Sequence, residues 1–516
     1  MLTLRDNFSI LAYINILVMG MMSNESLEMN ESIDLSSLQT VLLEAGFTEK
    51  NVSGLIKRCT TNRGYDLPSL LRLTEGPQRL NRLVRLFVFG QPLPETEIRD
   101  ALTPFPLEKL VATGLVRIGH SGEVTSQVCI LPYGEIMTLR DFGADWTGRT
   151  TGADYVMGVS ASSISLALTT VRQQSEEVLD LGTGGGIQAM LAARHARRVI
   201  GTDINPRALA LARLAMRING IANVELRQGS MFDPVQGQTF DLIVSQPPFV
   251  ISPENIKTFR DSGMPGDTFC EQILRQAPDH LREGGWCSII FSWGHRNDDQ
   301  WSDRPRTWVE GCGCDGWILR LRADDVFSYA VQWIGGTGDE GEGPDTQPLD
   351  KWLTYYEEMG FEMISTGVAV LHKRMAGKNW VRVDALEKQD AQGPCGPQIQ
   401  NVFAAETLLR SLPEPGPLLD VRLRLTEEHE MQQTSTLASG AWQIKETQLV
   451  QRRGFAFPCR IDRMSTEFLS LCDGSSTIRS VIESLAQRFS LDFQHLSEEA
   501  LPITVRLMRN GYLVPV

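Results

Sequence analysis

The stretch EEVLDLGTGGGIQAMLAARHA, residues 176–196, joins a short apolar run, a glycine cluster and an alanine- and leucine-rich helical pattern. This order predicts a β-strand, a tight turn and an α-helix. Gly182, Gly184 and Gly186 let the backbone turn sharply and approach a ligand closely, which a Cβ atom would prevent. The stretch therefore predicts the first strand and the ligand-binding turn of an α/β fold.

Three further strands follow at the spacing of alternating strands and helices. They are predicted at RRVIGTD (197–203), NVELRQGSMFD (223–233) and FDLIVSQPPFV (240–250). The first of them ends in Asp203, where a carboxylate can accept the hydroxyl protons of a ribose. A glycine turn together with a ribose-binding acid predicts a cofactor that contains a nucleoside.

The spacing of the glycines distinguishes between such cofactors. A dinucleotide fingerprint requires glycine at its first, third and sixth positions, and the sixth position here is Ile187. Asp180 lies two residues before the first glycine, where a carboxylate would face a pyrophosphate unfavourably. A carboxylate at that place suits a cationic ligand, such as the sulfonium and amino groups of S-adenosylmethionine.

Three motifs occur in an order that is typical of one enzyme family: DLGTGGG (180–186), GTDINP (201–206) and SQPPF (245–249). Together they resemble class I S-adenosylmethionine-dependent methyltransferases, in the branch that carries an (N/D/S)-P-P-(Y/F) motif. Within this branch the chain is similar to the small-domain group, which contains release-factor glutamine methyltransferases and ribosomal RNA guanine-N2 methyltransferases. The resemblance covers residues 150–375 and implies a Rossmann-like sheet of seven strands.

The resemblance also implies the residues of the site. Its cofactor-binding residues would be Asp180, Gly182 and Gly184 at the methionine part, Asp203 at the ribose and Ser230-Met231 at the adenine, with Thr183, Ile204 and Gln246 beside them. Its catalytic loop would be Gln246, Pro247, Pro248 and Phe249, which would grip the target nitrogen. By family position, residues 155–160 would lie near the methionine end of the cofactor.

Gln246 departs from the family pattern, which usually has Asn at the first position of the proline motif. The chemistry needs a fixed acceptor for the N–H of a planar nitrogen, so that the nitrogen lone pair points at the methyl group. A glutamine carboxamide offers the same acceptor one methylene further from the backbone. Either the pocket is displaced to fit the longer side chain, or the activity is altered or lost.

The composition limits the remaining classes of protein. A chain of 516 residues predicts two to four domains. Its 49 basic and 63 acidic residues give a net charge of −14, which disfavours a broad nucleic-acid-coating surface but is compatible with a local basic patch. Nine scattered cysteines argue against a disulfide framework, and Cys312-Gly313-Cys314 lacks a second ligand pair at zinc spacing, so no metal site is predicted.

The N-terminal stretch SILAYINILVMGMM (9–22) is apolar but shorter than the roughly 20 residues that span a bilayer. It also lacks the basic start and the small-residue cleavage site of a signal peptide. Residues 1–35 are therefore predicted to be a disordered leader, with translation starting at Met21 or Met22. The protein is accordingly expected in the cytoplasm and not in a membrane.

Residues 36–150 show helical periodicity followed by PLEKLVATGLVRIGHSGEVTSQVCILPYG (106–134), whose strands turn at Ser121-Gly122. This pattern predicts an N-terminal winged-helix-like recognition domain, which binds nucleic acid or docks a peptide. Arg79, Arg82 and Arg85 on its helical face form either a solvated stripe or a phosphate contact.

The methyltransferase domain is placed at 151–375 and a C-terminal accessory domain at 376–516. In the latter, NGYLVPV (510–516) echoes TGLVRI (113–118) of the first domain, so a second winged-helix-like domain is predicted. The chain contains no nucleophile elbow, Walker loop or H-E-x-x-H motif.

The predicted function is S-adenosylmethionine-dependent methylation of an amide or exocyclic amine nitrogen of RNA or protein. The partner would be a ribosomal RNA, a tRNA or a translation factor. Two alternatives stay open: methylation of a natural product or peptide, and a non-catalytic scaffold that binds S-adenosylmethionine.

Overall fold

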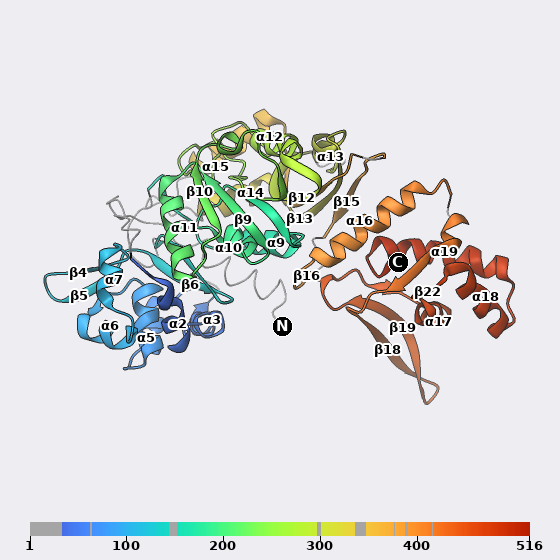
Figure 1. Cartoon of the computed structure of the whole chain (residues 1–516), viewed down its shortest axis with the longest axis horizontal. Helices are drawn as coiled ribbons and strands as arrows, with labels where there is room; N and C mark the ends of the chain where they lie inside the picture. Colours follow the sequence, from blue (N-terminus) through green and yellow to red (C-terminus); the bar gives the residue numbers. More distant parts are fainter. Residues whose placement is uncertain are drawn as a thin grey trace. The chain divides into compact units, whose positions relative to one another are not determined.

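The structure is a computed structural model (Figure 1) that describes residues 33–61, 64–143, 152–296, 301–335, 347–375, 377–386, 391–414 and 416–516. The predicted leader, residues 1–35, lies almost wholly outside this range. The described residues form two compact units. The first contains residues 33–167 and 172–385, and the second contains residues 168–171 and 386–516.

One eight-stranded sheet forms the centre of the first unit. Its strands in spatial order are β10 (Val224–Gln228), β9 (Ala196–Asp203), β8 (Ser175–Leu181), β11 (Phe240–Ser245), β12 (Leu281–His295), β14 (Met363–Lys373), β13 (Cys314–Asp325) and β15 (Val381–Ala385). Strands β10 to β12 run parallel, and β14 is antiparallel to both of its neighbours. The strand order reverses between β8 and β11, so a ligand crevice is expected beyond their carboxyl ends.

The prediction of a Rossmann-like α/β sheet is confirmed, with eight strands in place of the predicted seven. The additional strand, β15, pairs in parallel with β13, from Gly316 opposite Val381 to Arg320 opposite Ala385. The partners are 65 residues apart in the chain. Only tertiary pairing therefore identifies this short edge strand, which lies beyond the boundary predicted at residue 375.

Helices cover the sheet on both sides (Figure 1). They are α9 (Ala161–Thr169), α10 (Ile187–Ala192), α11 (Pro206–Ile218), α12 (Thr268–Gln276), α13 (Asp303–Val309), α14 (Val326–Gly335) and α15 (Gln347–Met359), with the short 3-10 turns η1 (Asp233–Val235) and η2 (Ala277–His280). Helix α11 shows why they form. Asn205 caps it by accepting from the N–H of Arg207 at 2.9 Å, and Pro206 occupies its first position.

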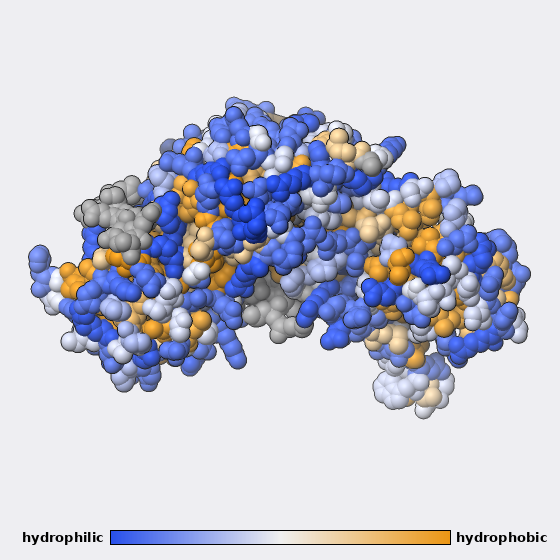
Figure 2. Space-filling view, viewed as in Figure 1, coloured by the Kyte–Doolittle hydropathy of each residue, from blue (hydrophilic) through white to orange (hydrophobic). Residues whose placement is uncertain are grey.

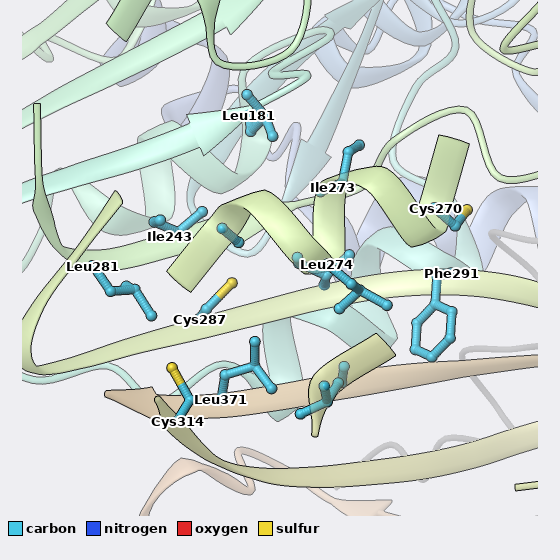
Figure 3. Close-up of a cluster of buried hydrophobic side chains, with 14 of the residues drawn as sticks. Leu181, Ile243, Cys270, Ile273, Leu274, Leu281, Cys287, Phe291, Cys314 and Leu371 are labelled. Carbon is cyan, nitrogen blue, oxygen red and sulfur yellow. The ribbon is translucent and has the colours of Figure 1, made fainter. Parts of the chain in front are cut away.

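The core of this unit is a hydrophobic cluster drawn in Figure 3. It joins Ile273 and Leu274 of α12 to side chains of β8, β11, β12, β13 and β14, such as Ile243, Phe291 and Leu371. Every one of these named side chains is almost fully buried. Apolar burial of this kind is the main driving force for folding, so the cluster fixes the strand ends that carry the candidate site.

The N-terminal part of the first unit is mainly helical. Its elements are α2 (Ser36–Glu44), α3 (Glu49–Arg58), β1 (Thr60–Thr61), β2 (Gly64–Tyr65), α4 (Leu67–Leu73), α5 (Arg79–Phe87), β3 (Leu93–Pro94), α6 (Glu95–Leu102), α7 (Leu107–Ala112), β4 (Val116–Ile118), β5 (Glu123–Ser126), β6 (Cys129–Tyr133) and β7 (Ile136–Arg140). Strands β3, β5 and β4 form a small sheet, and β6 and β7 form a hairpin.

Strand β7 contacts helix α11, which packs on β9 and β10 of the central sheet. The Asn219 carboxamide accepts from the N–H of Met137 and donates to its carbonyl, both at 2.8 Å. Arg207 binds both carboxylate oxygens of Asp141, which follows β7. Hydrogen bonds to the backbone of β7 and an ion pair at its end thereby hold the β6–β7 hairpin against α11.

The three arginines of α5 bind residues within the N-terminal part. Arg79 donates to the carbonyls of Ala101 and Thr103, at 2.9 and 2.8 Å. Arg82 pairs with Glu97 and Asp100 of α6, and Arg85 donates to Thr74 and Leu71. These guanidinium groups therefore connect neighbouring elements, and neither a solvated stripe nor an open phosphate contact describes them.

The second unit contains both helices and strands. Its elements are β16 (Ala391–Gln392), α16 (Gly396–Ser411), η3 (Gly416–Asp420), β17 (Arg422–Leu425), β18 (His429–Ala438), β19 (Ala441–Gln451), β20 (Gly454–Phe455), β21 (Cys459–Arg460), α17 (Arg463–Leu471), β22 (Asp473–Thr477), α18 (Ile478–Phe489), α19 (Phe493–Arg509) and β23 (Leu513–Pro515). Helices followed by a terminal strand agree with the predicted order. The long β18–β19 hairpin is an element that the sequence analysis did not predict.

Hydrophilic residues prevail on the face drawn in Figure 2. Large exposed hydrophobic side chains occur on the β18–β19 hairpin, where Trp442 is 74% and Leu437 is 64% exposed and the two are cross-strand partners. Within the described ranges, no helix has both the length and the apolar character needed to cross a membrane.

Candidate active site

A cavity of about 480 Å³ opens at the carboxyl ends of β8, β9 and β11, where the strand order predicts a ligand crevice. Its lining includes all nine residues predicted to bind the cofactor: Asp180, Gly182, Thr183, Gly184, Asp203, Ile204, Ser230, Met231 and Gln246. Residues separated by up to 66 positions in the chain therefore meet in one cavity, which makes it the candidate active site.

The proline motif contributes to the same wall through Gln246, Pro247 and Pro248. Its fourth residue, Phe249, is partly buried against the hydrophobic core of the sheet. Ser245 donates from its hydroxyl to the carbonyl of Leu181 at 2.8 Å and so ties the end of β11 to the end of β8. Phe249 is not part of the cavity lining, and its predicted role at the target group stays a prediction.

The glycine turn packs closely against its neighbours. Gly182 has φ +73°, in the left-handed region that favours glycine, and a Cβ there would lie 3.7 Å from the carbonyl oxygen of Gln246. A Cβ on Gly185 would lie 2.9 Å from the carbonyl oxygen of Leu139 in β7. The turn is thus confined between the proline motif and the N-terminal hairpin.

Asp180 is a buried acid at the end of β8. Its Oδ2 accepts from the Thr183 hydroxyl at 2.6 Å and from the N–H of Ala189 at 2.8 Å. Burial raises the pKa of Asp180 to about 6, although these two hydrogen bonds act to lower it. Within the described residues Oδ1 accepts no hydrogen bond, so the carboxylate can bind a cationic group in the cavity.

The raised pKa of Asp180 affects folding stability in a definite direction. A free aspartate has a pKa of about 3.9, and the folded protein holds this proton up to a pKa of about 6. Between these values the folded state binds more protons than the unfolded state. The contribution of Asp180 to stability therefore falls as the pH rises from about 4 to about 6, in the protein without ligand.

A cationic cofactor reverses this preference because it favours the ionised carboxylate. We expect the affinity for S-adenosylmethionine to fall about tenfold between pH 7 and pH 5, as Asp180 becomes protonated. Calorimetric titrations across this range measure the effect directly. In Asp180→Asn the affinity should be lower at pH 7 and nearly independent of pH. A pH profile that this substitution leaves unchanged would assign the titration to another group.

Asp203 occupies the end of β9 and is half-buried. Its Oδ2 accepts from the N–H of Gly184 at 2.8 Å, and its Oδ1 accepts from the N–H of Asn205 at 2.9 Å. Burial raises its pKa above the ordinary value, against the lowering effect of these backbone donors. Each carboxylate oxygen has two lone pairs, so both retain an acceptor position that fits the two hydroxyls of a ribose.

Gln246 is held at its amide nitrogen. Its Nε2 donates to the hydroxyl oxygen of Ser160 at 3.2 Å. Ser160 precedes α9 and is buried, as is Ser163 one turn later. Within the described residues the amide oxygen Oε1 accepts no hydrogen bond, so it can accept one from a ligand in the cavity.

Two loops close around the cavity beside Gln246. Residues 155–159, predicted to lie near the methionine end, belong to the lining. The segment after the proline motif contributes Asn255, Ile256, Thr258, Phe259, Asp261 and Ser262. Thr258 joins the loops, since its N–H and its hydroxyl both donate to the carbonyl of Ala153, at 3.2 and 3.0 Å.

Two parts of this lining were not predicted from the sequence. Thr138 and Leu139 come from β7, and nothing in their local pattern links them to a glycine turn that begins 43 residues after Leu139. The loop after the proline motif could have been included, because it directly follows residues already assigned to the site. Asp261 holds that loop by accepting from the N–H groups of Ile256 and Lys257 at 3.0 Å.

The sheet order, the glycine turn and the two acids at its carboxyl edge are those of a class I S-adenosylmethionine-dependent methyltransferase domain. Residues 160–297 match the family described as methyltransferase small domain. This segment is therefore a methyltransferase small domain, and its cofactor is S-adenosylmethionine. Residues 44–127 and 400–515 match two families described as domains of unknown function, DUF7059 and DUF7782.

The curated relatives of this chain include glutamine methyltransferases. A release factor glutamine methyltransferase from Geobacter sulfurreducens is 37% identical over 131 residues, which are 23% of this chain and 45% of that protein. A ribosomal protein uL3 glutamine methyltransferase from Bradyrhizobium diazoefficiens is 32% identical over 165 residues, which are 29% of this chain and 52% of that protein. The chain thus spans about half the length of the curated relatives it matches.

Among solved structures, an rRNA methylase from Streptococcus thermophilus aligns with 41% of this chain and 94% of its own chain. The two are 16% identical, and the TM-score is 0.24. The homology to the release factor and uL3 enzymes is distant and covers 23% and 29% of this chain.

Proposed function

We propose that this chain transfers a methyl group from S-adenosylmethionine to the side-chain amide nitrogen of a glutamine in a protein. The observation that carries the proposal is the carboxamide of Gln246, anchored at Nε2 and facing the cavity beside the glycine turn. An oriented Oε1 at this place can accept the N–H of a planar nitrogen. The relatives named as glutamine methyltransferases of a release factor and of uL3 support an amide in a translation protein as the acceptor.

The described residues fit the cofactor of this family. Asp203 would bind the ribose hydroxyls, and Asp180 would face the cationic methionine end. Ser230 and Met231, which follow β10, would border the adenine. When bound, the cofactor supplies an electrophilic methyl group.

The residues of the chain would act on the acceptor by position. Gln246 Oε1 and the carbonyl of Pro247 would each accept an N–H, which turns the nitrogen lone pair toward the cofactor side of the cavity. Two consecutive prolines restrict the backbone of the loop and keep these acceptors in place. Effective concentration supplies most of the rate in such a reaction, and neither a covalent nucleophile nor a metal is required.

The flanking regions would recognise the acceptor. We place this role in residues 36–150, as a winged-helix-like domain, and treat 376–516 as an accessory domain that is also winged-helix-like. The arginines of α5 bind within their own domain, and the whole chain carries a net charge of −14. Both facts favour a protein acceptor over RNA, because RNA binding relies on cations that are free to contact phosphates.

Methyl-labelled S-adenosylmethionine tests the proposal. The full-length protein is incubated with cell lysate and the labelled cofactor, and the lysate is then separated into protein, RNA and small-molecule fractions. We expect the label in protein, and mass spectrometry of the digest should locate it on a glutamine side chain. Label in the RNA fraction or in the small-molecule fraction would contradict the glutamine proposal and would identify RNA or a small molecule as the acceptor. Binding of the cofactor without transfer to any fraction would favour a non-catalytic scaffold.

A further inference from the structure

Ser160 lies directly against the residue in which this chain departs from its family. Its hydroxyl oxygen accepts from Gln246 Nε2 at 3.2 Å and from the N–H of Ser163 at 3.2 Å. The Ser163 hydroxyl in turn accepts from the N–H of Ser160 at 3.1 Å. This reciprocal pattern is a capping box at the start of α9, so Ser160 is fixed by the helix before it contacts Gln246.

The hydrogen-bonding capacity of Ser160 is compatible with the contact that it makes with the Gln246 amide nitrogen. A serine hydroxyl has two acceptor positions and one proton. Ser163 N–H and Gln246 Nε2 fill both acceptor positions, and the Ser163 hydroxyl lies 3.0 Å away to take the proton. In this arrangement one N–H of the amide binds Ser160, and Oε1 keeps its acceptor positions for the cavity.

A further pair of contacts supports the anchor. Gln188 of α10 donates from Nε2 to the carbonyl of Ser163 at 2.8 Å. Its Oε1 accepts from Arg172 at 2.9 Å. Gln188, Ser160 and Ser163 are all buried. The hydroxyl that meets Gln246 is therefore part of a connected and rigid set of polar groups.

The length of Gln246 makes such an anchor necessary. Compared with asparagine, glutamine adds one carbon–carbon bond of about 1.5 Å and one more rotatable torsion. A longer free side chain would spread its amide over several positions, and orientation is the main contribution expected from this residue. A hydrogen bond at Nε2 removes that freedom without using the acceptor oxygen.

We propose that Ser160 is the positioning residue that holds the Gln246 carboxamide with its oxygen toward the acceptor substrate, and so lets glutamine serve where the family has asparagine. This inference rests on the proposed amide methylation. Ser160 itself touches neither the cofactor nor the transferred group in this role. It acts through Gln246.

The test compares variants of the full-length chain in methyl transfer to the labelled fraction. Ser160→Gly removes the hydroxyl but retains a residue that caps helices well. We expect about a tenfold fall in kcat, with the affinity for S-adenosylmethionine unchanged. Ser160→Thr keeps a hydroxyl and should restore most of the rate. Ser162→Ala, on the same helix, partly exposed and outside the cavity lining, is the matched control and should behave as the unaltered protein.

Non-additivity separates positioning from a general structural effect. In a Gln246→Ala background, Ser160→Gly should cost no further activity, because the group through which it acts is already absent. An equal tenfold loss in both backgrounds would overturn the proposal, and so would a full rate in Ser160→Gly alone.

A direct readout keeps this inference separate from the proposed function. In protein labelled with ¹⁵N in glutamine side chains, the Gln246 amide signal is assigned by its loss in Gln246→Ala. That signal should shift in Ser160→Gly and stay in place in Ser162→Ala. If no lysate fraction accepts a methyl group, the proposed function fails while this measurement still tests the contact. A Gln246 signal that is insensitive to Ser160 overturns the positioning role, whatever the activity.

Discussion

Replacing Gln246 with alanine should lower methyl transfer about a hundredfold or more, while the affinity for S-adenosylmethionine changes little. The lost group orients the acceptor nitrogen, and misplacement by about one ångström is felt strongly in such a reaction. Gln246 is anchored at Nε2 on Ser160, so truncation removes the only part of the side chain that can face the acceptor. Initial rates with labelled cofactor measure transfer, and calorimetry measures cofactor binding.

Gln246→Asn is the more discriminating substitution. The shorter amide cannot reach Ser160 and the acceptor together, so this variant should also lose activity. Gln236→Asn, a matched change in the loop after η1 and outside the cavity lining, should have no effect. If Gln246→Asn instead raises the rate, the pocket is still built for asparagine, and the native glutamine marks a degraded or repurposed site. If neither substitution alters the rate, the proline motif is structural here and the catalytic loop is assigned wrongly.

Asp203→Ala should weaken binding of S-adenosylmethionine at least tenfold without unfolding the protein. The substitution removes the acceptor for two ribose hydroxyls, and a hydrogen bond to a charged group contributes roughly 1.5–3 kcal/mol. It also releases the N–H of Gly184, which Asp203 accepts at 2.8 Å. The glycine turn should therefore lose some of its order, which adds to the loss of affinity.

Calorimetry with S-adenosylmethionine and a thermal melt of each variant separate these effects. Asp233→Ala is the control, since this acid begins η1 and lies outside the cavity lining. It should bind the cofactor normally. An Asp203→Ala protein with a normal melting temperature and unchanged affinity would show that the ribose is held by other groups.

Several features of the fold could be predicted because each depends on a few residues that are adjacent in the sequence. The glycine turn after β8, the acid at the end of β9 and the proline motif after β11 each combine a strand pattern with a specific neighbouring residue. Parallel strands bring their carboxyl ends to one edge of a sheet, so the convergence of Asp180, Asp203 and Gln246 follows from the strand pattern alone. The nine predicted cofactor residues do line one cavity.

The turn of the β18–β19 hairpin also has a signal in the local sequence. The β18–β19 hairpin turns at Ser439-Gly440, where both residues have positive φ, at +52° and +78°. Such a two-residue turn is typical of β-hairpins, and Ser-Gly between alternating residues indicates it. The same dipeptide at Ser121-Gly122 was recognised as a turn between strands, and β4 and β5 pair around it.

The sequence by itself determined the class of domain, the cofactor and the edge of the sheet at which they meet, because each of these depends on residues that are close in the chain. Only the tertiary structure decided the rest. It placed Leu139 of β7 against Gly185, joined the amide of Gln246 to Ser160, and turned Phe249 toward the core. It also engaged the arginines of α5 within their own domain. The physical reason is common to all four: a side chain takes the partner that packing brings within hydrogen-bond or van der Waals distance, and that partner lies far away in sequence.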